Sequence, residues 1–232
     1  MRLDKYLCDT LNMTRTEAKK AISSGRVFVG DIKAKSGSLQ IEKEEVFLDG
    51  CPVEYQKFFY IMLHKPAGYV CANRDSKSKT VFDLLPADFQ KKDLFVCGRL
   101  DKDTTGFVLL TNNGDLAHRL LAPKKHVFKE YMVTLRDKVS KEDICRLEEG
   151  LCLRDGLQCK PAYFEPLQPA CGILKISEGK FHQIKRMFES LDNKVVALHR
   201  ISIHGLTLDP ALREGECRYL NDSEVAELEA VR

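Results

Sequence analysis

The sequence contains no tryptophan, no cysteine pair spaced as C-x-x-C and no apolar run near the ~18 residues that a membrane-spanning helix needs. Its opening segment, MRLDKYLCDTLN, carries charges throughout, where a signal peptide has an unbroken apolar stretch. We therefore expect neither export nor membrane insertion. The nine cysteines are odd in number and scattered, which favours reduced thiols in the cytoplasm over a disulfide framework or a zinc site.

A strong net charge is also missing, since the 232 residues carry a formal charge of only +3. With 44% hydrophobic and 31% charged residues, the composition is that of a folded chain of one or two domains. The charge is unevenly placed. Residues 1–35 hold eight basic and four acidic side chains, whereas residues 214–232 hold two basic and six acidic ones. This asymmetry is expected if the front of the chain faces a polyanion.

The first part of the chain reads as a small helical unit followed by a hairpin. Thr14 and Glu17 form a T-x-x-E capping box that predicts a helix to about Ser24. The stretch RVFVGDIKAK then alternates apolar and polar residues around a Gly30-Asp31 turn, which predicts a hairpin. Residues 51–58 read as a linker, so we expect domains over residues 1–57 and 58–232. The helix cations could also form an ordinary solvated face.

In the second part, strands and helices alternate without a regular βαβ rhythm or a glycine-rich phosphate loop. This pattern predicts an α+β domain with a mostly antiparallel sheet flanked by helices. The expected strands are Phe59–Leu63, Leu94–Cys97, Phe107–Leu110, Tyr131–Leu135 and Ile173–Ile176, and the expected helices lie near Asp115–Leu121, Lys141–Glu149, Gln183–Ser190 and Ser223–Ala230.

Two polar blocks stand out as candidate sites. In GRLDKDTTG, Asp101 and Asp103 follow an apolar strand, and paired aspartates there fit a hydrolase, a metal site or a simple turn. A metal site is disfavoured because no two histidines lie at i and i+4. In ISEGKFHQIKRMF, Lys185 and Arg186 begin a helix and could bind phosphate or pair with a buried aspartate. We expect His182 to be structural rather than a base.

Together with KEYMVTL, these blocks resemble the pseudouridine synthases of the RsuA type over essentially the whole chain. The matching segments, in order, are MRLDK, MLHKPAGYVC, GRLDKDTTGFVLLT, HR followed by AP, KEYMVTL, EGKFHQIKRMF and LHRISIHGLTLD. Residues 1–60 also resemble the S4 RNA-binding domain through RLDKYL, TRTEAKKAI and GRVFVGD. The motif EG-x-x-HQ-x-KRM and the opening RLDK favour the type that acts on 16S ribosomal RNA, for which the family site is uridine 516.

The resemblance implies a role for several side chains. Asp101 matches the catalytic aspartate, which acts as a nucleophile. Tyr131 matches the tyrosine that stacks on uracil. Lys185 matches the basic partner of the aspartate, a position that is arginine in many relatives. Asp103, His182 and His199 are expected to be structural, and Thr105 and Gly106 to shape the loop. Further substrate contacts are expected from Arg99, Ile184 and Met187, and RNA contacts from Arg2, Lys5, Arg15, Lys19, Lys20, Arg26 and Arg186.

The implied activity is the isomerisation of one uridine to pseudouridine without a cofactor or metal, by a cytoplasmic monomer. Its expected partner is 16S ribosomal RNA or a partly assembled small ribosomal subunit, bound after the target base is flipped out. Two alternatives remain at this point, a synthase acting on 23S ribosomal RNA and a noncatalytic S4-type protein of the ribosome. A carboxylate glycosidase is disfavoured because it leaves the basic first unit without a role.

Overall fold

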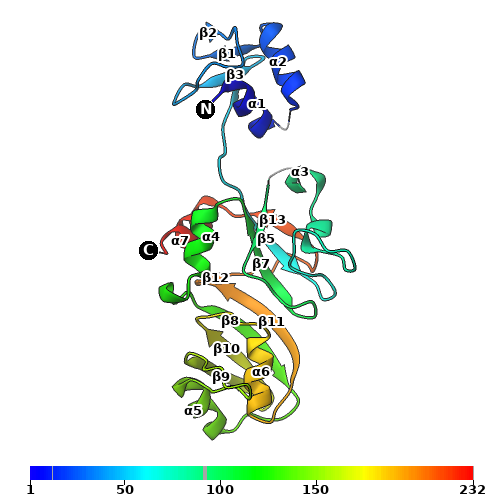
Figure 1. Ribbon diagram of the computed structural model, residues 1–232, viewed down its shortest axis with the longest axis vertical. Coiled ribbons are helices and arrows are strands. Elements are labelled where there is room, and N and C mark those ends of the chain that lie inside the picture. Colours follow the sequence, from blue (N-terminus) through cyan, green and yellow to red (C-terminus); the bar gives the residue numbers. More distant parts are fainter. Residues whose placement is uncertain (12, 91–92, 232) are drawn as a thin grey trace. The chain divides into compact units, whose positions relative to one another are not determined.

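The computed structural model describes residues 1–11, 13–90 and 93–231, and it divides into two compact units, Met1–Lys57 and Phe58–Arg232 (Figure 1). Each unit has its own hydrophobic core. Among the described residues, no helix combines the length and the apolar character needed to cross a bilayer.

The first unit packs two helices against a small antiparallel sheet. The helices are α1 (Leu3–Leu11) and α2 (Arg15–Ser23), and the strands are β1 (Val27–Val29), β2 (Ile32–Lys33), β3 (Val46–Leu48) and β4 (Cys51–Val53), in the order β2-β1-β3-β4. Thr14 caps α2 with the predicted capping box, and Gly25 follows the helix with a φ of 76°. The hairpin forms as predicted, with Val29 opposite Ile32.

One expectation for this unit was wrong. Residues 51–58 were expected to be a linker, but Cys51–Val53 form a strand paired with β3. Val53 is buried in the core of the unit, which draws the segment into the sheet. Pro52 is tolerated because β4 lies at the edge of the sheet and an edge strand can lack one backbone donor.

The second unit is an α+β domain built on a large mixed sheet, in the order β13-β5-β7-β11-β8-β10-β9. Among its described strands, only β7 and β11 pair in parallel. The strands of the described residues are β5 (Tyr60–Lys65), β6 (Phe95–Cys97), β7 (Thr105–Thr111), β8 (Lys129–Leu135), β9 (Ala162–Gln168), β10 (Cys171–Ile176), β11 (Val195–Ile203), β12 (Leu206–Thr207) and β13 (Cys217–Tyr219). The helices are η1 (Val81–Leu84), α3 (Ala87–Gln90), α4 (Gly114–Leu121), η2 (Pro123–Lys125), α5 (Lys141–Glu149), α6 (Gln183–Ser190) and α7 (Asp222–Glu229).

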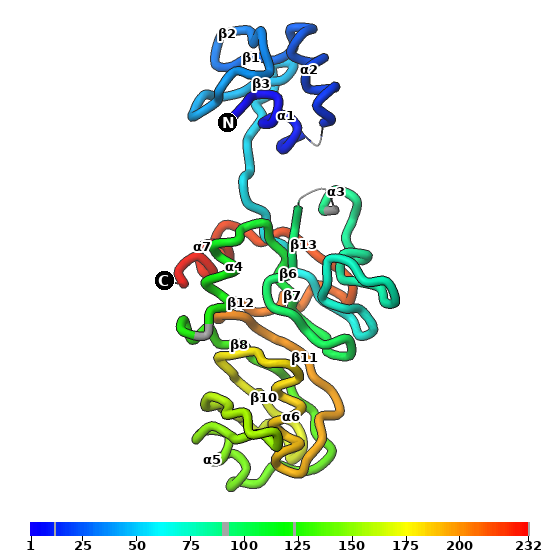
Figure 2. The backbone as a smooth tube through the Cα atoms, viewed as in Figure 1, coloured from blue at the N-terminus to red at the C-terminus, as the bar shows by residue number. Residues whose placement is uncertain are grey.

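Helices cover the two faces of this sheet and create two cores. Along β5, Tyr60 and Met62 face the core that contains residues of α4 and α7, whereas Ile61 and Leu63 face the core that contains residues of α5 and α6. The central strands therefore read as continuous apolar runs, as expected for strands buried on both faces. The backbone tube in Figure 2 shows α4 and α7 together and α5 and α6 together.

Candidate active site

The loop that carries Asp101 lies between β6 and β7 and is fixed by a buried lysine. The Lys65 side chain is fully buried, and its Nζ donates hydrogen bonds to the backbone oxygens of Pro66 (3.1 Å), Lys102 (3.2 Å) and Thr104 (2.6 Å). Burial lowers the pKa of Lys65. Because this ammonium group binds backbone oxygens on both sides of Asp103, the loop has little freedom to move.

The same loop is held from the other side by β11. The hydroxyl of Thr105 lies 2.8 Å from Nδ1 of His199, and Gly106 pairs with Arg200 across the parallel junction of β7 and β11. Gly106 has a φ of +103°, and a Cβ atom there would lie 2.3 Å from the Arg200 carbonyl oxygen. Only glycine fits this close approach, so the residues expected to shape the loop do lie where the loop joins the sheet.

Asp101 lies beside two basic groups from the α6 segment. Nζ of Lys185 is 3.1 Å from Oδ2 of Asp101, and Nε2 of His182 is 3.6 Å from Oδ1. Lys185 also donates a 2.6 Å hydrogen bond to Asp103. This bond is the main cause of the lowered pKa of Asp103. Burial lowers the pKa of Lys185, but its bonds to Asp103 and Asp101 outweigh that effect and raise it.

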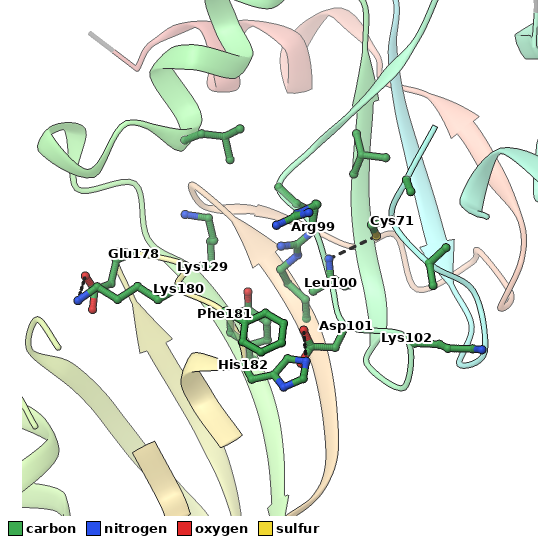
Figure 3. A pocket seen from close by; sticks show the side chains of 18 residues that line it. Cys71, Arg99, Leu100, Asp101, Lys102, Lys129, Glu178, Lys180, Phe181 and His182 are labelled. Carbon is green, nitrogen blue, oxygen red and sulfur yellow. Dashed lines mark hydrogen bonds and ion pairs between the residues drawn. The ribbon is translucent and has the colours of Figure 1, made fainter. Parts of the chain in front are cut away.

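Helix α6 brings Lys185 to the loop because its other face is anchored in the core. Ile184, Met187 and Phe188 are buried there, and Lys185 points away from them toward the aspartates. His182 precedes the helix with a left-handed backbone (φ 48°), and its ring stacks on that of Phe181 with centroids 3.8 Å apart. The turn into the helix thus places an aromatic pair beside Asp101 (Figure 3).

A cavity of about 740 Å³ opens next to this cluster. Asp101, Tyr131 and His182 line it together, and Tyr131 is only 6% exposed. A smaller cavity of about 70 Å³ shares Asp101 and Tyr131 and is lined also by Lys185. A carboxylate, an ammonium group and an aromatic ring therefore meet at one hollow, a combination that suits nucleophilic chemistry on a planar base.

Of the other residues expected to contact the substrate, some line the cavities and others do not. Arg99 lines both cavities, and Ile184 lines the smaller one. Met187 lines neither cavity, because it lies fully buried on the core side of α6. Arg186 forms an ion pair with Asp155.

The expected RNA contacts of the first unit fall into two groups. Arg2 forms an ion pair with Asp4, and Arg26 forms one with Asp49. The remaining cations are exposed and make no ion pair with any described residue; they are Lys5, Arg15, Lys19 and Lys20. Arg15 and Lys19 lie one turn apart on α2, so they project from the same side of the helix.

Several side chains at the cavity were missed in the sequence. They are Lys129, Arg200, Glu178 and Phe181, and Lys65, which holds the loop of Asp101, was missed as well. A signal for Lys129 was available, because KEYMVTL alternates and places Lys129 on the same inward face as Tyr131. Within the described ranges, no group of three or more His, Cys, Asp or Glu side chains is arranged to hold a metal ion.

Comparison with known proteins agrees with this arrangement. Residues 59–190 match the family model of RNA pseudouridylate synthases, and residues 1–47 match that of the S4 domain. An uncharacterized RNA pseudouridine synthase of Bacillus subtilis (strain 168) is 44% identical, with 97% of each chain covered. The ribosomal small subunit pseudouridine synthase A of Vibrio cholerae is 41% identical over 98% of this chain and 99% of its own.

A solved structure described as a pseudouridylate synthase aligns with 98% of this chain and 99% of its own at 41% identity, with a TM-score of 0.71. The similarity to these proteins therefore extends over both the catalytic domain and the S4 unit. The chain belongs to the RNA pseudouridine synthases of the RsuA type, which are isomerases.

Proposed function

We propose that this chain converts one uridine of 16S ribosomal RNA to pseudouridine, with uridine 516 as the expected site, and that it acts on the RNA or on a partly assembled small subunit. The main support is the position of Asp101, which lies 3.1 Å from Lys185 on the wall of a cavity that Tyr131 also lines. Relatives named ribosomal small subunit pseudouridine synthase A, which are 41–43% identical over nearly the whole chain, support the choice of RNA.

The reaction breaks the N1–C1′ bond of uridine and forms a C5–C1′ bond, while the proton on C5 leaves and N1 gains one. Substrate and product are isomers, so the proposed reaction needs no cofactor. Asp101 acts as the nucleophile, as carboxylates do when glycosidic bonds break. Lys185 keeps the carboxylate oriented toward the cavity, and the ring of Tyr131 stacks on the detached uracil so that it can turn without leaving.

The base must leave the RNA stack before it can enter this cavity. The cost of unstacking, a few kcal/mol, is offset by contacts between the protein and RNA phosphates. The exposed cations of α2 are suited to such contacts because they have no protein partner among the described residues. The S4 unit therefore supplies affinity, and the second unit supplies the chemistry.

The test is the variant Asp101→Asn, which keeps the shape of the side chain and removes the nucleophile. With 16S RNA labelled with tritium at C5 of uridine, we expect tritium release to fall at least about 10³-fold, while affinity for the RNA stays within about twofold. Asp75→Asn, on an exposed loop, is the matched control and should keep full activity. Undiminished release by Asp101→Asn would refute the catalytic role, and faster release from 23S RNA would refute the proposed target.

A further inference from the structure

Two buried cations on the cavity wall are not used by the chemistry at Asp101. Lys129 and Arg200 both line the 740 Å³ cavity, and they are 7% and 1% exposed. Lysine and arginine are almost never buried to this extent without a partner. Among the described residues, no carboxylate lies within ion-pair distance of either side chain.

The strand register places these two side chains next to the tyrosine. Tyr131 on β8 lies opposite Arg200 on β11, and Lys129 lies two residues before Tyr131, on the same face of β8. Lys129 and Arg200 are therefore diagonal neighbours across two paired strands. Figure 3 shows Lys129 on the wall of the cavity that holds Asp101.

Both side chains keep donors that the protein does not use. Nε of Arg200 donates to the Phe107 carbonyl oxygen (2.7 Å) and Nη2 donates to that of Gly98 (2.8 Å), whereas Nη1 has no acceptor among the described residues. Nζ of Lys129 donates to the Val127 carbonyl oxygen (3.2 Å), and an ammonium group has three donors. The cavity wall therefore offers free N–H groups on two positive charges.

Two carboxylates of the described residues line this cavity, and both are engaged elsewhere, Asp101 with Lys185 and Glu178 with other groups. The Oε1 atom of Glu178 accepts hydrogen bonds from Nε2 of Gln183 (2.6 Å) and from the backbone N–H of Lys160 (3.0 Å). Its Oε2 lies 3.5 Å from Nζ of Lys180. The positive charges of Lys129 and Arg200 are thus left without a counter-charge from the protein.

The electrostatic cost of this arrangement is reflected in the pKa of Lys129. Burial lowers the pKa of Lys129 to about 8, and the nearby positive charge of Arg200 lowers it as well. An anion between the two groups would remove the second effect and offset the first. The site is therefore better suited to binding an anion than to binding a neutral ligand or to remaining empty.

We infer that Lys129 and Arg200 form a binding site for a phosphodiester group of the RNA, adjacent to the uridine held at Asp101. The inference rests on the proposed function, since an RNA bound with its target base near Tyr131 brings backbone phosphates to the same cavity. A guanidinium and an ammonium group are the usual ligands of phosphate oxygens. The bound phosphate fixes the position of the flipped nucleotide, because phosphate contacts set register and base contacts set identity.

The test combines a change in the protein with a change in the RNA. The protein is the full chain carrying Asp101→Asn, so that bound RNA is not converted, with or without Lys129→Met. The RNA is a 16S fragment in which the phosphate on the 5′ or on the 3′ side of the target uridine is replaced by a neutral methylphosphonate. The ribose whose 2′-hydroxyl could cleave that linkage is 2′-deoxy in the modified RNA and in its reference RNA.

We expect one of the two neutral linkages to weaken binding about tenfold in the parent protein and less than twofold in the Lys129→Met protein. The matched control is Lys175→Met, which removes a partly exposed cation of the neighbouring strand β10 that pairs with Glu130 of β8, and it should keep the tenfold loss. Lys129→Arg, which keeps the positive charge, should also keep most of the tenfold loss of binding. Thermal unfolding verifies that each variant is folded.

Equal losses in the parent and in Lys129→Met at both linkages would overturn the inference, and so would the absence of any loss in the parent. These outcomes are separate from a failure of the proposed function. A failure of the proposed function would appear as a lack of pseudouridine in unmodified 16S RNA treated with the protein that retains Asp101. That measurement is independent of the comparison of binding constants.

Discussion

Lys185 is shared between two carboxylates, and this sharing separates the roles of Asp101 and Asp103. Asp103 makes the shorter contact, at 2.6 Å against 3.1 Å, but its side chain is 73% exposed and its ion pair is weakened by solvent. Asp101 is the more enclosed of the two and lines the cavity. We therefore expect Asp103 to assist in placing Lys185 and Asp101 to react.

The variant Lys185→Met tests this division. It removes the group that orients Asp101, so we expect the single-turnover rate of pseudouridine formation to fall about 10²-fold. The control Asp103→Asn leaves the contact between Lys185 and Asp101 in place and should cost less than about tenfold. Equal losses in the two variants, measured by tritium release at saturating RNA, would show that Asp103 is as important as Lys185.

Lys129 is predicted to destabilise the folded protein near neutral pH. Its pKa of about 8 in the folded chain lies below the usual 10.5, with Arg200 and Cys97 as its charged or titratable neighbours. The folded state therefore disfavours the proton. This penalty is present in full below pH 8 and disappears as the pH rises from about 8 to 10.5.

Accordingly, Lys129→Met should raise the free energy of unfolding at pH 7 by up to about 3 kcal/mol, the value that corresponds to a pKa lowered from 10.5 to about 8. The gain should shrink at pH 9.5, where most of the wild-type lysine is already neutral in the folded state. Denaturant unfolding at the two pH values measures both numbers. A loss of stability at pH 7, or a gain that does not change with pH, would contradict the assignment of a buried charged lysine.

The site residues show what a sequence can and cannot predict. Asp101, Tyr131 and Lys185 were placed through resemblance to a family, because residues 84 positions apart cannot be paired from local patterns. Lys65 and Arg200 were missed because basic residues are usually exposed, and only the fold shows them buried against backbone oxygens.

At the scale of elements, the junction of β7 and β11 depends on one glycine. Gly106→Ala would place a methyl group 2.3 Å from the Arg200 carbonyl oxygen at a positive φ. We expect a loss of at least about 3 kcal/mol in the free energy of unfolding. Gly114→Ala at the start of α4 has open space around it and should change stability by less than about 1 kcal/mol. Similar melting temperatures for the two variants would contradict this view of the junction.

Helix α2 is expected to contact RNA phosphates through its unpaired cations. Lys19→Gln or Lys20→Gln should each reduce the slope of log affinity against log salt concentration by roughly one unit. Arg26→Gln is the internal comparison, and its effect should be smaller because Arg26 already pairs with Asp49. Filter binding between 50 and 200 mM salt, as is usual for such slopes, gives the values. Unchanged slopes for the Lys19→Gln and Lys20→Gln variants would show that α2 is not part of the RNA interface.

Elements with strong local signals were predicted well, and the others were not. The capping box of Thr14 and Glu17 predicted the start of α2, because such a box depends on residues only three positions apart. Strand β9 was missed because it contains Pro166 and lies at the sheet edge. Strand β11 was missed because Arg200 and Ser202, both buried, interrupt its apolar pattern. Long-range pairing, not local propensity, makes these two segments strands.

At the scale of the whole molecule, we propose that the first unit supplies affinity for RNA and the second unit supplies the chemistry. The exposed, unpaired cations described for the first unit are suited to phosphates wherever the RNA presents them. All residues that line the 740 Å³ cavity belong to the second unit, so this site is complete within it. Variants of the first unit should therefore change mainly RNA affinity, whereas variants at Asp101 or Lys185 should change mainly the rate of the bound complex.

The most direct measurement maps the pseudouridines of all ribosomal RNAs in cells that lack this gene and carry either the wild-type chain or Asp101→Asn. We predict that one pseudouridine in 16S RNA, at uridine 516, is present with the wild-type chain and absent with Asp101→Asn, while every pseudouridine of 23S RNA is unchanged. A 16S pseudouridine that persists with Asp101→Asn, or a loss confined to 23S RNA, would contradict the account.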